Sequence, residues 1–261
     1  MNGQLAMRLS GAAWPLATII VLGVLWQVSV PESALDVVPT PMQAIVALAS
    51  MLVSGKLLAG LVVSWTTVLE GFAVATVLGV AIGIAAGYWS AVAGWITPVL
   101  NLLRPIAPFA WIPMAILWFG AGGGAGVMIT AYAAFFPIVT NTLAGVARIR
   151  GSLVVTARTL GASEWLILRR IILPGALPLI LVGLRLGIGL AWAAVIAAEL
   201  ATGQSTNAAP GVGYLMYLNF AVDADVNAIV AMMLAIGVSA LIGDAALRWL
   251  QHRLVHWPAE H

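Results

Sequence analysis

The most constraining feature of this sequence is a series of six apolar runs, each long enough to form a membrane-spanning helix. A helix needs about 20 consecutive apolar residues to cross the hydrocarbon core of a bilayer. Segments that hold most of the charged residues separate the runs, which are residues 12–30, 64–89, 96–119, 127–146, 177–200 and 227–249. The pattern predicts an all-α fold, a polytopic membrane helical bundle of about six transmembrane helices.

The composition excludes several classes of protein. Hydrophobic residues make up 62% of the 261 residues, and charged residues only 8%. Soluble domains are about one quarter charged, so this chain could not cover a soluble surface. The formal net charge of +2 gives no support for a nucleic-acid partner. Cysteine is absent, which removes disulfides and thiolate metal sites. We expect residues 1–261 to form a single transmembrane domain in contact with lipid.

Local patterns predict two features around the second run. Thr40 is suited to cap a short, interfacial helix over residues 41–54. Inside the run, Gly79, Gly83 and Gly87 are spaced four apart, which lets another helix approach closely. We expect these glycines to serve helix packing.

The third run is the most irregular. It contains Pro105, Pro108 and Pro113, each of which removes a backbone hydrogen-bond donor. Residues 96–119 are nevertheless predicted to form one span. Five glycines among residues 120–126 then predict a tight loop.

The positions of the basic residues predict the orientation. Five arginines lie within residues 147–170, and with six spans this segment shares a side with Arg8 and the C-terminal arginines, whereas Lys56 lies opposite. Basic loops face the cytoplasm, so the N- and C-termini and the arginine-rich segment are predicted to be cytoplasmic. Arg104 and Arg185 are expected near the span ends that face this side, and no basic residue is predicted at the midplane.

The arginine-rich segment has the pattern of a helix, a turn and a second helix. Gly161 can adopt the left-handed conformation that ends a helix. Ser163 can cap the next helix, and Glu164 suits its positive end. Pro174 is expected to end the helix before the fifth span. A compact, basic, folded knob is predicted.

This spacing resembles the EAA loop of permease subunits of ABC importers. The matching positions are Ala157, Gly161, Ile171, Leu173 and Pro174. Val155 and Thr156 stand where that pattern has Glu and Ala. Further stretches are similar to the taurine, alkanesulfonate and nitrate branch of these permeases, namely residues 103–113, 117–120, 135–137, 173–178, 183–185 and 211–214.

The resemblance implies a type I ABC importer permease with a cytoplasmic coupling helix in residues 147–174. Such a permease is a homodimer in the bacterial inner (plasma) membrane. It sits on two copies of a cytoplasmic ATPase subunit and receives solute from an extracytoplasmic binding protein. The residues assigned to ATPase coupling are Val155, Thr156, Ala157, Arg158, Gly161, Ala162, Ser163 and Glu164.

It further implies that this chain is a transport subunit and not an enzyme, with no catalytic residue, cofactor or metal of its own. ATP and Mg would be used by the partner ATPase. The segment around Lys56 lacks the glycine and hydroxyl positions of a P-loop, which agrees with this. Similar permeases carry taurine, alkanesulfonates, nitrate, bicarbonate, aromatic acids or pyrimidines, so a small, anionic solute is expected.

Bulky apolar side chains in the third and fifth runs are candidates for walls or gates of the translocation path. The candidates are Trp111, Met114, Trp118, Trp192 and Ile196. Ordinary helix packing is the alternative for each of them.

Two other functions remain open. A stand-alone secondary transporter or channel would show ion-coordinating groups or broken helices in both halves. A membrane-embedded enzyme would need a catalytic cluster, yet all three histidines lie in the last ten residues. Elsewhere, Glu70 could pair with a neighbour or mark a site. Asp244 is expected to pair with Arg248 four residues later.

Overall fold

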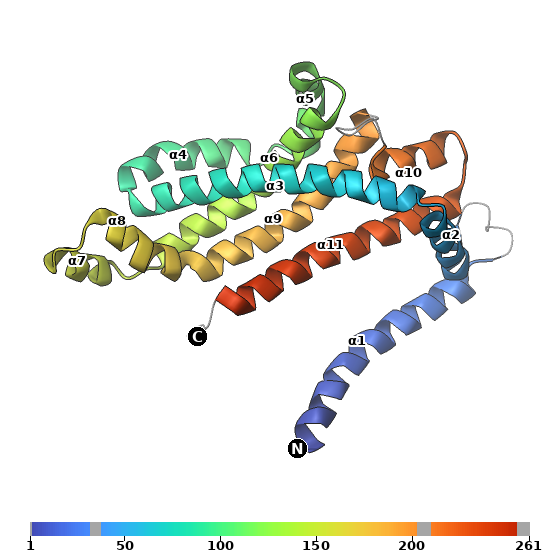
Figure 1. Ribbon diagram of the computed structural model, residues 1–261, viewed down its shortest axis with the longest axis horizontal. Coiled ribbons are helices and arrows are strands. Elements are labelled where there is room, and N and C mark those ends of the chain that lie inside the picture. Colours follow the sequence, from blue (N-terminus) through green and yellow to red (C-terminus); the bar gives the residue numbers. More distant parts are fainter. Residues whose placement is uncertain (1, 32–37, 203–209, 255–261) are drawn as a thin grey trace. The chain divides into compact units, whose positions relative to one another are not determined.

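The computed structural model describes residues 2–31, 38–202 and 210–254, and within these ranges the chain forms helices and turns without a strand (Figure 1). The predicted all-α class is therefore confirmed. The chain divides into two compact units. The first combines residues 1–57 with 216–235, and the second combines residues 58–215 with 236–261. The single transmembrane domain stays a prediction.

The first unit holds α1 (Asn2–Ser29), α2 (Pro41–Val53), most of α10 (Val212–Ala221) and the start of α11 (Val226–Leu254). α2 begins at a capping box. The side chain of Thr40 accepts a hydrogen bond from the backbone N–H of Gln43, and the side chain of Gln43 accepts one from the backbone N–H of Thr40. The predicted cap and short helix are confirmed.

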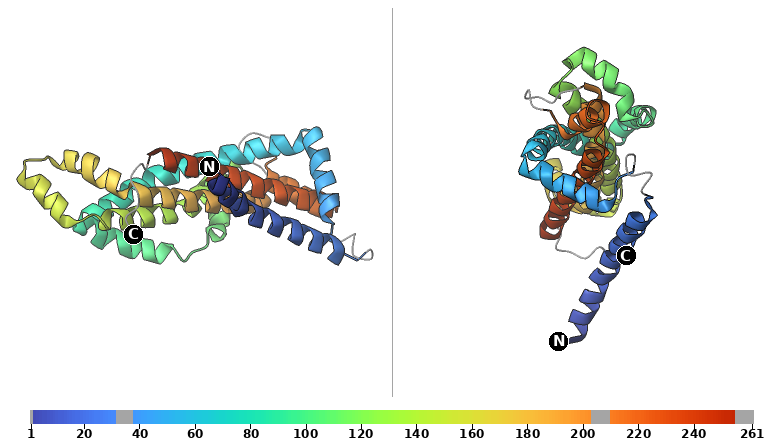
Figure 2. Two further views of the ribbon diagram at one scale, coloured as in Figure 1. Left: turned by 90° about the horizontal axis from the view of Figure 1, so that it is seen from below. Right: turned by 90° about the vertical axis from the view of Figure 1, so that its right-hand side faces the viewer.

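The second unit holds the remaining helices and the end of α11. These helices are α3 (Lys56–Tyr88), α4 (Ser90–Leu103), η2 (Pro108–Trp111), α5 (Ile112–Phe119), α6 (Gly123–Ala147), α7 (Gly151–Thr159), α8 (Glu164–Ile167), η3 (Leu168–Ile172) and α9 (Leu173–Thr202). α6 and α9 pack along each other, and α3 runs beside them (Figure 2).

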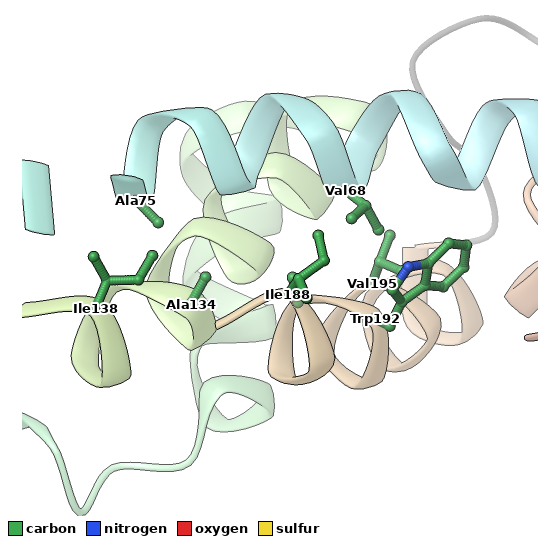
Figure 3. Close-up of a cluster of buried hydrophobic side chains, with 8 residues drawn as sticks. Val68, Ala75, Ala134, Ile138, Ile188, Trp192 and Val195 are labelled. Carbon is green, nitrogen blue, oxygen red and sulfur yellow. The ribbon is translucent and has the colours of Figure 1, made fainter. Parts of the chain in front are cut away.

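The core of the second unit lies where these three long helices meet (Figure 3). Its buried members are Val68, Ala75, Ala134, Ile138, Ile188, Ala191, Trp192 and Val195. The cluster combines small alanines with larger side chains, which lets the helices approach closely.

The glycines of α3 permit this approach. A Cβ atom on Gly83 would lie 2.6 Å from Cβ of Thr142 on α6, and one on Gly87 would lie 2.6 Å from Cβ of Val146. Gly79 meets Ile138 in the same way. The packing role predicted for these glycines is confirmed.

Within the part of the chain that the structure describes, four stretches are long and apolar enough to cross a membrane: α3, α6, the continuous stretch Glu164–Thr202 and α11. The third run, which was predicted to be one span that contains prolines, is interrupted, and its count as a single span stays a prediction. It is broken into α4 and the stretch Pro108–Phe119, which are bent by 88°. The physical reason is the group of prolines, because Pro108 starts η2 and Pro113 lies in the first turn of α5. Counted as one broken span, the pair makes five, and Ala17–Ser29 of α1 is a shorter apolar stretch.

Two other boundaries differ from expectation. The glycine-rich loop is shorter than predicted, because α6 begins at Gly123. A Cβ atom on Gly126 would lie 3.0 Å from Cγ2 of Thr67, so this glycine lets α3 and α6 approach closely. The helix also continues through Pro174, where an end was expected. The preceding turn, η3, is a π-helix whose wider backbone spacing accommodates a residue without an N–H.

Candidate functional site

The turn between α7 and α8 is a Schellman motif built around Gly161. Its φ angle is +82°, in the left-handed region that favours glycine. The N–H of Ala162 donates to the carbonyl of Ala157, and that of Gly161 donates to the carbonyl of Arg158. Ser163 then accepts a hydrogen bond from the N–H of Leu166 at 3.3 Å. The predicted helix, glycine turn and cap are confirmed.

A polar triad closes this hairpin and ties it to the end of α3. Nε of Arg158 donates to Oε1 of Glu164 at 2.9 Å, and Nη2 of Arg158 donates to the hydroxyl of Tyr88 at 2.9 Å. The hydroxyl of Tyr88 donates in turn to Oε2 of Glu164. The hydrogen bonds to Glu164 and Tyr88 raise the pKa of the Arg158 guanidinium above its usual value. Solvent screens the exposed ion pair of Arg158 and Glu164, so it adds little to stability. Its main effect is to fix the geometry of the hairpin.

The predicted coupling residues therefore have different surroundings. Ala157 and Ala162 pack inward, against the cluster of Ile167 and Ile172. Arg158 and Glu164 bind each other, whereas Val155, Thr156, Gly161 and Ser163 are exposed.

Sequence reasoning missed the most exposed apolar side chains of this hairpin. Leu160 is 82% exposed and Trp165 is 70% exposed. The turn conformation that presents Leu160 depends on the fold, so no local pattern shows its exposure. Figure 2 shows this hairpin at one end of the second unit, in the part of the chain between α6 and α9. An exposed apolar patch on such a projection is suited to protein docking.

A cavity of about 740 Å³ lies between the α4–η2 segment, α6 and α9. Its lining is mainly apolar and includes Phe109, Phe136 and Leu190. Two arginines, Arg104 and Arg185, also line it. Sequence reasoning had placed both near span ends, but Arg185 is the thirteenth of the 30 residues of α9.

The predicted path residues do not line this cavity. Trp192 is 1% exposed and packs edge-on against Trp65, with ring centroids 4.9 Å apart. Ile196 packs against the same core. The rings of Trp111 on η2 and Trp118 on α5 lie near each other, with centroids 6.4 Å apart and planes tilted by 41°.

Met114, the remaining path candidate, is 39% exposed on α5. The structure thus brings Trp111, Met114 and Trp118 together on one broken element and places Trp192 and Ile196 in a separate packed core. The assignment of all five to the path stays a prediction.

A buried carboxylate forms a second polar centre that sequence reasoning did not single out. Glu199 is 2% exposed. Its oxygens accept hydrogen bonds from Oγ of Ser64 at 2.8 and 2.9 Å and from the N–H of Gly213 at 2.8 Å. Oγ of Ser64 accepts the N–H of Val212 at 3.0 Å. These contacts fasten the start of α10 to α3 and α9.

Charged groups also link α9 and α11. Nε of Arg185 pairs with Oδ1 of Asp244 at 2.8 Å, and Oδ2 of Asp244 pairs with Arg248 at 3.2 Å. The predicted pair of Asp244 and Arg248 is confirmed. Among the described residues, no group of three His, Cys, Asp or Glu side chains could hold a metal ion.

Residues 75–256 match the family described as the binding-protein-dependent transport system inner membrane component. The chain belongs to this family. The permease is thus the membrane-spanning subunit of an ABC importer, as the sequence resemblance implied.

Relatives agree with this assignment. A protein of Methanocaldococcus jannaschii named as an ABC transporter permease is 35% identical over 226 residues, which cover 87% of this permease and 80% of that protein. The taurine transport system permease of Escherichia coli is 34% identical over 77% of this permease and 70% of its own length. The bicarbonate transport system permease of Synechococcus elongatus is 32% identical over 94% and 90%.

A solved structure shares the fold. One chain of the MetNI methionine ABC transporter, in an inward facing conformation, superposes with a TM-score of 0.64 and 16% identity. The match covers 77% of this permease and 97% of that chain. The predicted type I permease fold is confirmed.

Proposed function

We propose that two copies of this permease assemble with two copies of a cytoplasmic ATPase subunit and import a small anion. The solute is delivered by an extracytoplasmic binding protein and is a sulfonate, taurine, nitrate or bicarbonate. ATP and Mg are used in the ATPase, and this chain binds neither. Relatives named for taurine and bicarbonate transport support this substrate class.

The observation that carries the coupling proposal is the continuous helical stretch Glu164–Thr202. Its 39 residues extend about 58 Å at 1.5 Å per residue, roughly twice the thickness of the hydrocarbon core. One helix therefore connects the α7–α8 hairpin to the core of the bundle. Movement of the hairpin is therefore transmitted directly to α9.

The hairpin is also stiff enough to transmit force. The Schellman turn fixes its backbone, and Tyr88 connects it to α3 through Arg158 and Glu164. ATPase closure therefore displaces α3 and α9 together. Leu160 and Trp165 supply apolar area for docking, and Val155 and Thr156 supply the neighbouring surface.

In this arrangement the hairpin and both chain termini lie in the cytoplasm. The arginine distribution supports this orientation, because basic residues are retained on the cytoplasmic side. The permease then switches between outward-open and inward-open states that the ATPase and the binding protein bias from opposite faces.

The decisive experiment is reconstitution of this single permease with its partner ATPase and binding protein. We expect Gly161→Val to leave the permease in the membrane but to lower uptake and solute-stimulated ATP hydrolysis by on the order of tenfold. A β-branched residue at φ +82° is strained, so the docking turn must rearrange. Gly151→Val is the matched control, because Gly151 has open space around it and no positive φ.

Wild-type coupling in the Gly161→Val complex would contradict the proposed lever. A requirement for a second, different permease would exclude the homodimer. Full uptake without any ATPase would instead support a stand-alone transporter or channel.

A further inference from the structure

The 740 Å³ cavity places positive charge in apolar surroundings. Arg104 and Arg185 share its lining with side chains such as Phe136 and Leu186. An arginine stays positively charged in proteins and carries five N–H donors. The cavity therefore combines an apolar wall with two fixed cationic hydrogen-bond donors.

The charges around this cavity do not balance. Asp244 is shared between Arg185 and Arg248, so one carboxylate serves two guanidinium groups. No described carboxylate lies within ion-pair distance of Arg104. The excess charge is positive, which attracts an anion into the cavity.

Arg185 keeps donors available. The bond to Asp244 uses Nε, and the two Nη nitrogens of Arg185 make no hydrogen bond to the described residues. A guanidinium can bind carboxylate-like oxygens in pairs through such adjacent N–H groups. The group is thus positioned by Asp244 and still able to bind a ligand.

The backbone around Arg104 is fixed by Tyr132. The hydroxyl of Tyr132 on α6 donates to the carbonyl of Leu103 at 2.7 Å and approaches that of Ile106 at 3.3 Å. The carbonyl of Leu103, the last residue of α4, also accepts the N–H of Ile106 at 3.0 Å, so the turn that follows the helix is held from two sides. Tyr132 therefore positions the segment that carries Arg104 at the cavity.

We propose that Arg104 and Arg185 form a subsite for a small oxyanion inside this cavity. The inference rests on the proposed function and assigns a place where the imported solute is held. Charge-assisted hydrogen bonds to sulfonate, carboxylate or bicarbonate oxygens supply the attraction. Binding is weak, because Arg104 is not enclosed by the rest of the chain and Arg185 is shared with Asp244. Weak binding suits a conduit that must release its solute.

The phosphate of an anionic lipid headgroup carries the same oxyanion chemistry. The test therefore uses the purified full-length permease in nanodiscs of phosphatidylcholine alone and of phosphatidylcholine with phosphatidylglycerol. Ethanesulfonate and bicarbonate serve as probes, and binding is followed by saturation-transfer NMR for ethanesulfonate and by ¹³C line broadening for bicarbonate.

We expect saturable binding of at least one probe to the wild type in both lipid mixtures. Arg104→Gln should weaken it about tenfold or more, because a charge and its donors are removed. Arg104→Lys should retain part of the affinity through its charge. Arg148→Gln is the matched control, since Arg148 is exposed but does not line this cavity. Folding of each variant is checked by its thermal transition.

Equal binding by the wild type and Arg104→Gln, or no binding of either probe to the wild type, would overturn the subsite. Binding that disappears when phosphatidylglycerol is added would overturn its assignment to the solute and assign the arginines to lipid. If the reconstituted complex imports an anion but the binding tests contradict the subsite, only the proposed subsite is wrong. If the complex imports no anion, the proposed substrate class is wrong as well.

Discussion

At the scale of single residues, Glu199 shows how a buried carboxylate can act as a remote helix cap. The first N–H groups of a helix lack intrahelical partners. For α10 those of Val212 and Gly213 are taken by Ser64 and Glu199, from two other helices. A Cβ atom on Gly211 would lie 2.2 Å from Oε1 of Glu199, so a glycine is required there. The carboxylate and this glycine form one structural unit.

We predict that Glu199→Ala lowers the stability of the permease by about 1–3 kcal/mol. The substitution leaves the hydroxyl of Ser64 and the N–H of Gly213 buried without an acceptor, which has a free-energy cost of this size. The measurement is the midpoint of thermal unfolding in detergent. Glu70→Ala serves as the control, because Glu70 is an exposed acid on α3 and should change stability by less than about 0.5 kcal/mol. Equal midpoints for both variants would contradict the role of Glu199.

The same scale marks where sequence reasoning reaches its limit. The pair of Asp244 and Arg248 follows from helical spacing and was predicted. Its second partner, Arg185, lies 59 residues away, and no local pattern connects them. The shared cavity of Arg104 and Arg185 and the buried contacts of Glu199 were missed for the same reason, since they depend on packing between distant helices.

At the scale of elements, the spacing of small residues gives a reliable signal. The glycines of α3 were predicted to pack against another helix, and they contact α6 at Thr142 and Val146. Proline positions are harder to interpret. Three prolines break the third run, whereas Pro174 lies inside a continuous helix because η3 adjusts the backbone before it. A π-helical turn has no simple sequence signature.

We predict that Gly83→Ala destabilises the contact between α3 and α6. The added Cβ would lie 2.6 Å from Cβ of Thr142 and 2.9 Å from the carbonyl of Val139, so the helices must separate. The expected loss is about 1–3 kcal/mol, seen as a lower thermal midpoint and a lower yield of monodisperse permease.

Gly94→Ala on α4 is the matched control for this variant. A Cβ atom on Gly94 meets nothing within 4 Å, and alanine favours a helix over glycine by up to about 1 kcal/mol. Gly94→Ala should therefore be neutral or stabilising. An unchanged thermal midpoint in Gly83→Ala would contradict the prediction, because it would show that α3 and α6 can separate without a loss of stability.

At the scale of the whole molecule, the sequence predicted the class of fold and the family because apolar runs and the turn around Gly161 are local features. The matched permease structure and the family assignment confirm both. Membrane orientation is different in kind. It follows from the charge distribution and a general rule, and it decides whether the α7–α8 hairpin can reach a cytoplasmic ATPase at all.

The absence of cysteine allows a clean test of this orientation. Leu160→Cys and Phe220→Cys each introduce one thiol at a side chain that is 82% or 73% exposed in its own unit. In intact spheroplasts, a membrane-impermeant maleimide should label Phe220→Cys at once. Leu160→Cys should react only after the membrane is permeabilised, because we expect the hairpin to lie in the cytoplasm. The wild type is the unreactive control, and recovery of each variant in the membrane fraction shows that it is inserted. Labelling of Leu160→Cys from outside would place the hairpin on the face where no ATP is available, and the coupling mechanism would fail.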